Sequence, residues 1–166
     1  MSDIETIGQS SDEGLFIPGN WNIPYNYAAG NVASHFFRRL KEDGKIFGTL
    51  CPTCARTLVP PRSFCERCFV PCTEWREVGP EGTVVTFTVS LRKTPGLMRE
   101  PPFMIALIRL DGADTNLIHL VDGCDLSSPQ ALLERVRGGL RVKAVFLPVD
   151  ERKGHILDIQ SFKVLE

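Results

Sequence analysis

The chain has 166 residues, of which 43% are hydrophobic and 23% are charged. This composition is typical of a folded domain and excludes the collagen-like and intrinsically disordered classes. Lys and Arg number 19 against 20 Asp and Glu, and the resulting net charge of −1 argues against a protein that coats a polyanion with its whole surface.

Two features of the sequence bear on localisation. The longest apolar runs, such as residues 103–108, have five or six residues, far fewer than the roughly 20 that a bilayer-spanning helix needs. Residues 1–13 are polar and acidic, without the apolar core of a secretory signal. We therefore expect a cytoplasmic protein with no membrane partner.

An aromatic arm precedes the first predicted helix. In residues 21–27, which read WNIPYNY, the side chains of Trp21, Ile23, Tyr25 and Tyr27 alternate with polar residues or proline, so an extended segment presents them on one face. Trp and Tyr are enriched in binding hot spots. We predict that these four side chains bind a partner protein, and the alternative is that the arm packs on its own chain.

One short amphipathic helix is predicted after the arm. Asn31 has the chemistry of an N-cap and Gly44 that of a C-terminal stop. The apolar residues between them follow helical spacing: Val32, Ala33, Phe36, Phe37 and Leu40. Residues 1–45 are therefore expected to form an N-terminal arm and helix.

Four of the six cysteines form two C-x-x-C pairs. Cys51 and Cys54 make the first pair, and Cys65 and Cys68 follow after a gap of ten residues. Two such knuckles place four thiolates around one point, which is the donor set of a tetrahedral zinc site. Since a closed shell of four sulfurs leaves no position for water or substrate, we predict one structural zinc ion in a ribbon at residues 46–73.

Three alternatives to this zinc site stay open. Four thiolates also hold a single iron ion. The cysteines form disulfides in some chains, which is disfavoured here because no export signal is visible. Cys72 is close enough in sequence to compete with Cys68, although Cys68 has the knuckle spacing.

Residues 74–166 carry the pattern of five strands and one helix. Apolar and polar residues alternate in five predicted strands, at 85–91, 103–110, 116–121, 140–147 and 155–164. Ser128 and Pro129 begin a helix that ends at Gly138. The order β-β-β-α-β-β is that of the OB-fold, a five-stranded barrel. The predicted fold class is therefore mainly β: N-terminal arm and helix, four-cysteine zinc ribbon, and OB-fold barrel.

Several motifs occur together between residues 37 and 84: FRRLKEDGKIFGTL at 37–50, the two cysteine pairs, Pro60-Pro61-Arg62 and Gly82-Thr83-Val84. This combination resembles the DUF35 family, in which a rubredoxin-like zinc ribbon precedes an acyl-CoA-associated OB-fold. The sequence departs from the family pattern at Ala55, where Gly is usual, and at Glu66, where Pro is common. The long N-terminal arm resembles the subgroup that is encoded with thiolases.

The resemblance implies a non-catalytic subunit that forms a hetero-oligomer with a thiolase-like catalytic subunit, and an acyl-CoA that the complex cleaves by thiolysis. The residues of the chain agree with this role. Once four cysteines bind metal, only Cys72 and Cys124 remain. The neighbouring Asp122 and Asp125 would raise the pKa of the Cys124 thiol, the wrong direction for a nucleophile. We predict no catalytic residue in this chain, the alternative being Cys124 with His119 as its base.

Coenzyme A is a polyphosphate with an apolar thioester arm, so cationic side chains are its candidate contacts. We select Arg62 beside the proline pair, and Arg92, Lys93 and Arg99 in the loop that follows the first barrel strand. The alternative for each is a solvated surface charge.

Nucleic-acid binding is the alternative function from another class, because zinc ribbons and OB-folds both serve it. A barrel that binds single strands combines exposed aromatics with a cationic groove. Residues 73–166 contain 12 Lys and Arg against 13 Asp and Glu, which disfavours this function.

Overall fold

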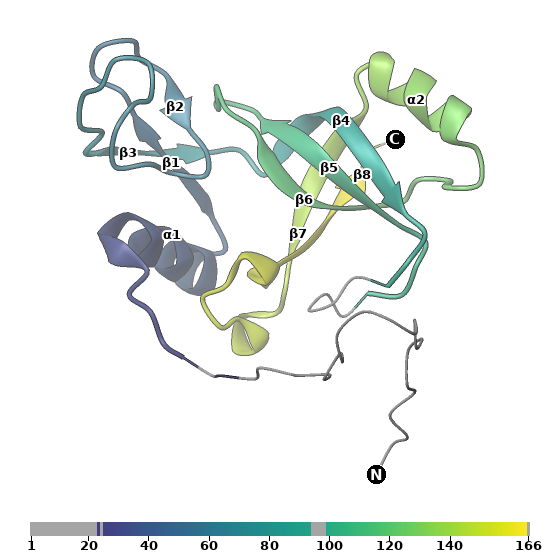
Figure 1. The fold of residues 1–166 in the computed structure, drawn as a ribbon, viewed down its shortest axis with the longest axis horizontal. Helices are drawn as coiled ribbons and strands as arrows, with labels where there is room; N and C mark the ends of the chain where they lie inside the picture. The colour runs from purple at the N-terminus through teal and green to yellow at the C-terminus, as the bar shows by residue number, and fades with distance from the viewer. Residues whose placement is uncertain (1–22, 24, 94–98, 166) are drawn as a thin grey trace, which may run out of the picture.

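A computed structural model describes residues 23, 25–93 and 99–165 and shows a small ribbon sheet, a helix beneath it and a β-barrel next to both (Figure 1). The α-helices and strands are, in chain order, α1 (Gly30–Asp43), β1 (Ile46–Leu50), β2 (Thr57–Leu58), β3 (Glu74–Val78), β4 (Glu81–Ser90), β5 (Phe103–Leu110), β6 (Leu117–Asp122), α2 (Pro129–Arg137), β7 (Arg141–Phe146) and β8 (Ile159–Val164). Among these residues, neither helix has the length and apolar character needed to cross a bilayer. The predicted mainly β fold with a cysteine ribbon and an OB-fold is confirmed.

Helix α1 differs from its prediction at one end. Its stop is confirmed, since Gly44 adopts the left-handed conformation with φ of 62°. The predicted N-cap Asn31 is wrong: the helix begins at Gly30, and no side chain caps its first turn. The physical reason is that Gly30, with φ of 76°, turns the chain into the helix through a conformation that glycine adopts without strain.

The ribbon sheet has the order β2-β1-β3. Strand β3 pairs with the full length of β1, from Ile46 opposite Val78 to Leu50 opposite Glu74, yet the sequence analysis did not predict it as a strand. Only Val78 of β3 is buried, so the strand lacks a strong alternation of apolar residues. The ribbon sheet therefore extends beyond residue 73 into β3. The domain division at 1–45, 46–73 and 74–166 stays a proposal.

The barrel has the closed strand order β4-β5-β6-β8-β7, with β6 and β8 parallel and the other neighbours antiparallel. Its last strand is shorter than predicted, because residues 156–158 form a 3-10 turn before β8. The buried carboxylate of Asp158 accepts the backbone N–H groups of Lys153, Gly154 and His155 at 2.9, 2.7 and 3.2 Å. These bonds hold the preceding residues in a turn rather than in a ladder.

The ribbon and the barrel meet where the turn between β5 and β6 lies beside β2 (Figure 1). The backbone N–H of Thr57 donates to the Asp114 carboxylate at 2.8 Å, and the Asp114 N–H donates to the Thr57 carbonyl at 2.8 Å. The Thr115 hydroxyl accepts from the Val59 N–H at 2.6 Å and donates to the Val59 carbonyl at 2.8 Å. Four hydrogen bonds therefore fix the edge of the ribbon to the barrel.

We expect Thr115→Val to lower the free energy of unfolding by about 1–3 kcal/mol, because it leaves the backbone N–H and carbonyl of buried Val59 without their partner. Thr88→Val, at an exposed position of β4, is the matched control and should change it by less than about 0.5 kcal/mol. Urea denaturation of the two variants measures the difference. Equal stability of both would contradict the importance of this junction.

Candidate metal centre

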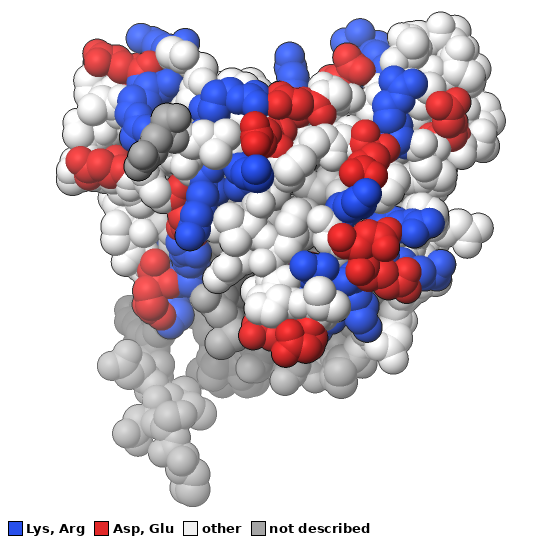
Figure 2. All heavy atoms as spheres, turned by 180° about the vertical axis from the view of Figure 1, so that it is seen from behind, with Lys and Arg blue, Asp and Glu red and all other residues white. Residues whose placement is uncertain are grey.

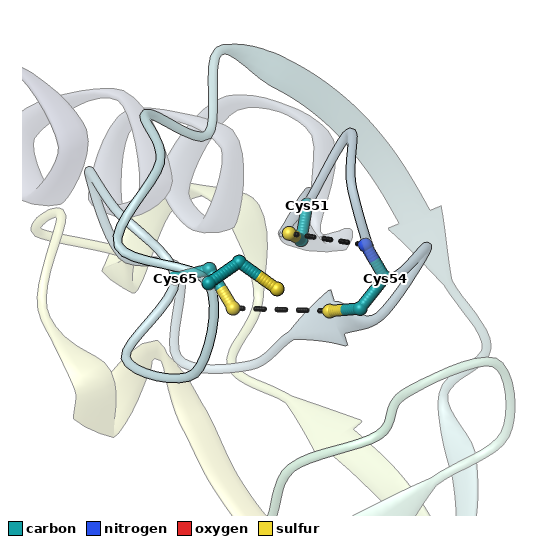
Figure 3. Close-up of side chains that lie close together, drawn as sticks. Cys51, Cys54 and Cys65 are labelled. Atoms are coloured by element: carbon teal, nitrogen blue, oxygen red, sulfur yellow. Dashed lines mark hydrogen bonds between the residues drawn. The ribbon is translucent and has the colours of Figure 1, made fainter.

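The sulfur atoms of the two cysteine pairs converge on one point of the ribbon. The Sγ atoms of Cys51, Cys54, Cys65 and Cys68 all lie within 4.8 Å of one another. Figure 3 shows the thiols of Cys54 and Cys65 facing each other, with their Sγ atoms 3.8 Å apart. Such a set of soft donors without an oxygen or nitrogen ligand fits a tetrahedral zinc ion with four Zn–S bonds.

Each cysteine pair is held in a tight turn of the same form. The Ala55 N–H donates to the Cys51 carbonyl at 3.0 Å, and the Phe69 N–H donates to the Cys65 carbonyl at 2.9 Å. Ala55 and Phe69 adopt the left-handed conformation, with φ of 56° and 53°. The family's usual glycine after the first pair is therefore not required for this geometry, although a non-glycine residue bears a strain there.

The electrostatics of the cluster favour a bound cation. The Cys54 N–H, 3.5 Å from the Cys51 sulfur, lowers the pKa of that thiol to about 6. A hydrogen bond with Cys54, together with burial, raises the pKa of Cys68 to about 12. Four thiols this close cannot all ionise beside one another, because each thiolate repels the next. A divalent ion removes that repulsion and allows all four sulfurs to bind as thiolates.

Cys72 lies next to this cluster but is not one of the four convergent sulfurs. Its side chain is buried, and its nearest hydrogen-bond partner is the Val70 carbonyl at 3.9 Å. Burial, with the neighbouring thiolates, raises the pKa of the Cys72 thiol. The structure thus places Cys68, and not Cys72, with the other three sulfurs.

Cys124 and His119 do not form a nucleophile–base pair among the described residues, where no hydrogen bond joins them. Burial is the main cause that raises the pKa of the Cys124 thiol; the charge of Arg135 lowers that pKa, and the charge of Asp122 raises it by a smaller amount. Of the two aspartates named in the sequence analysis, only Asp122 has the predicted effect, and that effect is smaller than the opposing one of Arg135. His119 is buried in the barrel, with Nε2 3.2 Å from the Ile156 carbonyl oxygen and Nδ1 without a partner in the described residues.

The aromatic arm is only partly described, since Trp21 lies outside the described residues. The side chains of Ile23, Tyr25 and Tyr27 are 64%, 79% and 80% exposed. The two tyrosine rings lie near each other, with centroids 6.2 Å apart. None of these three side chains is buried against the ribbon or the barrel.

The candidate CoA contacts do not form one cluster. Arg62 lies in the ribbon and pairs with Glu66 at 3.2 Å. The other three lie in the loop between β4 and β5, at the end of this hairpin that is remote from the ribbon (Figure 1). Lys93 pairs with Glu100 at 2.6 Å, and Arg99 pairs with Asp122. Arg92 is exposed and makes no salt bridge within the described chain. Residues 94–98 of this loop lie outside the described residues.

The sequence analysis missed an apolar surface on the outside of the barrel. Core residues of β5 and β6 point inward, and four aliphatic residues between them lie on the outer side of the sheet: Ile118 is exposed, Ile105 and Leu107 are half-buried, and Leu120 is buried. Leu107 lies opposite Ile118, and Ile105 lies opposite Leu120, so the four form a continuous patch. We call these four residues the outer aliphatic face. Its sequence signal is the nearly unbroken apolar run of β5, where a half-exposed strand would alternate.

A groove of about 330 Å³ adjoins the outer aliphatic face. Its walls come from α1, the proline pair, β6 and the turn before β8, through Ala33, Phe36, Phe37, Pro60, Pro61, Asn116, Leu117, Ile118 and Ile156. Ile118 is 63% exposed and belongs to both surfaces. In OB-folds the outside of the second and third strands, here β5 and β6, is the usual binding surface.

Positive charge does not gather into the groove that nucleic-acid binding requires on the face of the molecule in Figure 2. Figure 2 shows Lys and Arg interspersed with Asp and Glu on one face of the molecule. Several charges of the barrel neutralise one another: Arg141 pairs with Asp111 at 2.5 Å, and Lys143 pairs with Glu81 at 3.1 Å. The outer aliphatic face is bordered by one exposed cation, Arg109, which follows Leu107 on the same side of β5 and donates to Asn116 at 3.2 Å. These observations disfavour the alternative of nucleic-acid binding.

Comparisons with known proteins agree with the architecture. Residues 38–73 match the ChsH2 rubredoxin-like zinc ribbon domain, and residues 75–147 match the ChsH2 C-terminal OB-fold domain. No match was found among curated protein sequences. A solved protein of unknown function from the DUF35 family, from Sulfolobus solfataricus, is 27% identical with a TM-score of 0.52, over 81% of this chain and 84% of that chain. The Ltp2-ChsH2(DUF35) aldolase shares the fold, with 21% identity and a TM-score of 0.54 over 76% of this chain and 92% of that chain.

We expect the purified chain to be colourless and to contain about one zinc ion, as the four-sulfur shell requires. Cys68→Ser should lose stoichiometric zinc, because it removes one of the four convergent sulfurs. Cys72→Ser is the matched control and should retain the zinc. Elemental analysis of the three proteins measures this, and zinc loss from the Cys72 variant alone would reverse the assignment.

We expect His119 to make stability depend on pH. Burial lowers its pKa in the folded state below the ordinary value of 6.5, so the unfolded chain binds a proton first as the pH falls. The free energy of unfolding should decrease below pH 6.5, by at most about 1.4 kcal/mol per pH unit. His119→Gln should reduce this slope between pH 7.5 and 5.5, whereas Thr88→Val, at an exposed position without a titratable group, should retain it. Identical denaturation profiles for both variants would contradict this role.

Proposed function

Because the chain belongs to the DUF35 family and combines the zinc ribbon and OB-fold of the ChsH2 proteins, we propose that it is a non-catalytic subunit that docks on a thiolase-like or aldolase-type catalytic subunit. The observation that carries this proposal is the outer aliphatic face, where the exposed side chain of Ile118 lies opposite the half-buried Leu107. Apolar patches of this kind mark protein interaction sites. The name of the Ltp2-ChsH2(DUF35) aldolase, a protein of similar fold, joins a ChsH2 chain to an enzyme.

The chemistry of the cysteine and histidine side chains agrees with a non-catalytic role. The four convergent cysteines have no coordination position for substrate once zinc is bound. The pKa of Cys124 is raised and not lowered, and His119 is buried away from solvent. The reacting groups would therefore belong to the catalytic subunit. This chain would contribute by positioning the substrate and excluding water.

The finer proposal concerns the reaction. We propose thiolytic C–C cleavage of an acyl-CoA, with benzoylsuccinyl-CoA from the breakdown of aromatic compounds as the substrate. The support is the resemblance of the long N-terminal arm to the thiolase-partner subgroup; within that subgroup the chain resembles the zinc-binding small subunit of benzoylsuccinyl-CoA thiolase.

The CoA contacts are also a proposal. Among the four candidate cations, Arg92 is the one whose charge is not paired with a carboxylate in the described chain, so it can receive a phosphate without breaking a salt bridge. Lys93 and Arg99 would have to exchange Glu100 and Asp122 for the ligand. Arg62 lies at the other end of the molecule and would need a second site.

We expect this chain and the thiolase-like subunit encoded beside it to co-purify as a stable hetero-oligomer, with thiolytic C–C cleavage of the acyl-CoA absent from this chain alone. The double variant Trp21→Ala, Tyr25→Ala should weaken the complex by about 2–4 kcal/mol, because aromatic anchors dominate such interfaces. Size-exclusion chromatography and calorimetric titration measure assembly and affinity.

Val149→Ala is the control for the arm variant, since it removes another exposed apolar side chain, 67% exposed, from outside the arm. Its affinity should match that of the wild type. If wild-type chains form no complex, the proposed function is wrong. If the complex forms but the double variant binds as tightly, the arm packs elsewhere and only its assigned role fails.

A further inference from the structure

The second cysteine pair sits in a short, rigid hairpin, residues 63–72. Its stem is closed by the Cys72 N–H, which donates to the Ser63 carbonyl at 2.9 Å, and by the Cys65 N–H, which donates to the Val70 carbonyl at 2.9 Å. Within this stem, Cys65 and Cys68 contribute two of the four convergent sulfurs. Backbone bonds and metal ligation together therefore hold whatever side chains the hairpin presents.

The hairpin presents Phe69 in an unfavourable setting. Its side chain is 82% exposed, so the ring gains little burial from its own chain. Its φ of 53° lies in the left-handed region, which costs a bulky L-residue about 1–2 kcal/mol.

The first knuckle shows that the turn does not require an aromatic ring. Ala55 holds the equivalent position, with nearly the same φ of 56° and the same hydrogen bond to the first cysteine of its pair. Folding and metal binding thus explain the turn but not the phenyl ring of Phe69. The backbone strain and the exposure of the Phe69 ring are not offset by contacts within the chain, which indicates a contact outside it.

The surroundings of Phe69 define the chemistry of that contact. Phe64, on the other arm of the hairpin, is 52% exposed and forms a bridge with Pro71. Glu66 is neutralised by Arg56 at 2.8 Å and Arg62 at 3.2 Å. Arg67 is exposed and makes no salt bridge among the residues described here. The hairpin therefore offers two rings and one unpaired cation.

We propose that this knuckle is a docking anchor: Phe69, flanked by Phe64, enters an apolar pocket of the catalytic subunit whose rim presents a carboxylate to Arg67. The anchor rests on the proposed function and adds a surface distinct from the aromatic arm and the outer aliphatic face. A rigid aromatic side chain loses little conformational freedom on binding, which favours such anchors. A bound metal ion would then stabilise the ribbon and also hold the hairpin in the conformation that binds the partner.

The test titrates the full-length, zinc-loaded chain into the thiolase-like subunit encoded beside it. Phe69→Ala, which installs the residue of the first knuckle, should weaken binding about tenfold or more, with zinc content unchanged. Phe69→Leu should recover part of the affinity, because it restores apolar bulk but not the ring. Arg67→Glu should weaken binding about fivefold, and less at high salt. Val149→Ala, at a 67% exposed position far in sequence from the knuckle, is the control and should bind like the wild type.

The outcomes separate this anchor from the proposed function. No complex with wild-type chains overturns the proposed function. A wild-type complex that Phe69→Ala leaves unchanged overturns the anchor alone. The anchor is also overturned if Phe69→Ala loses both binding and zinc and Phe69→Leu does not recover the binding. The ring would then serve the fold and not the interface. If the complex does not require Phe69, but self-association or binding of a single-stranded oligonucleotide does, the ring belongs to a different partner and the anchor is overturned.

Discussion

The convergence of four sulfur atoms on one ion is the constraint on which the rest of the structure depends. The ribbon has two short strands of its own and a small cluster of buried residues, most of them cysteines. Such a segment buries too little apolar surface to fold by itself, and zinc binding worth about 10–16 kcal/mol supplies the missing stability. With the knuckles held, β1 becomes a template on which β3 pairs and α1 packs.

The same constraint determines what kind of function the chain can have. Sulfur atoms that saturate a metal shell neither attack a substrate nor polarise one. The thiols outside the shell are buried or half-buried, and burial raises the pKa of Cys72 and Cys124. The chain is therefore better suited to present surfaces than to make bonds. Its exposed rings and its outer aliphatic face are consistent with such a role.

The sequence predicted those parts of the molecule whose signal is local. The spacing of Cys51, Cys54, Cys65 and Cys68 predicts their convergence because each pair closes one tight turn. The order of strands and helix along the chain in the barrel follows from strand alternation and turn residues.

The errors arise where distant contacts decide. Strand β3 is polar and exists because β1 offers it hydrogen bonds. The turn before β8 exists because the Asp158 carboxylate collects three N–H groups. The outer aliphatic face was missed because its residues continue the apolar run of the core. The four candidate CoA-binding cations lie at two ends of the fold, and their positions in the sequence do not reveal this separation. The junction at Thr115 and Val59 links these parts into one body. Since the knuckle and the barrel face are thus fixed relative to each other, a partner that contacts both meets a preorganised surface and orders fewer groups on binding.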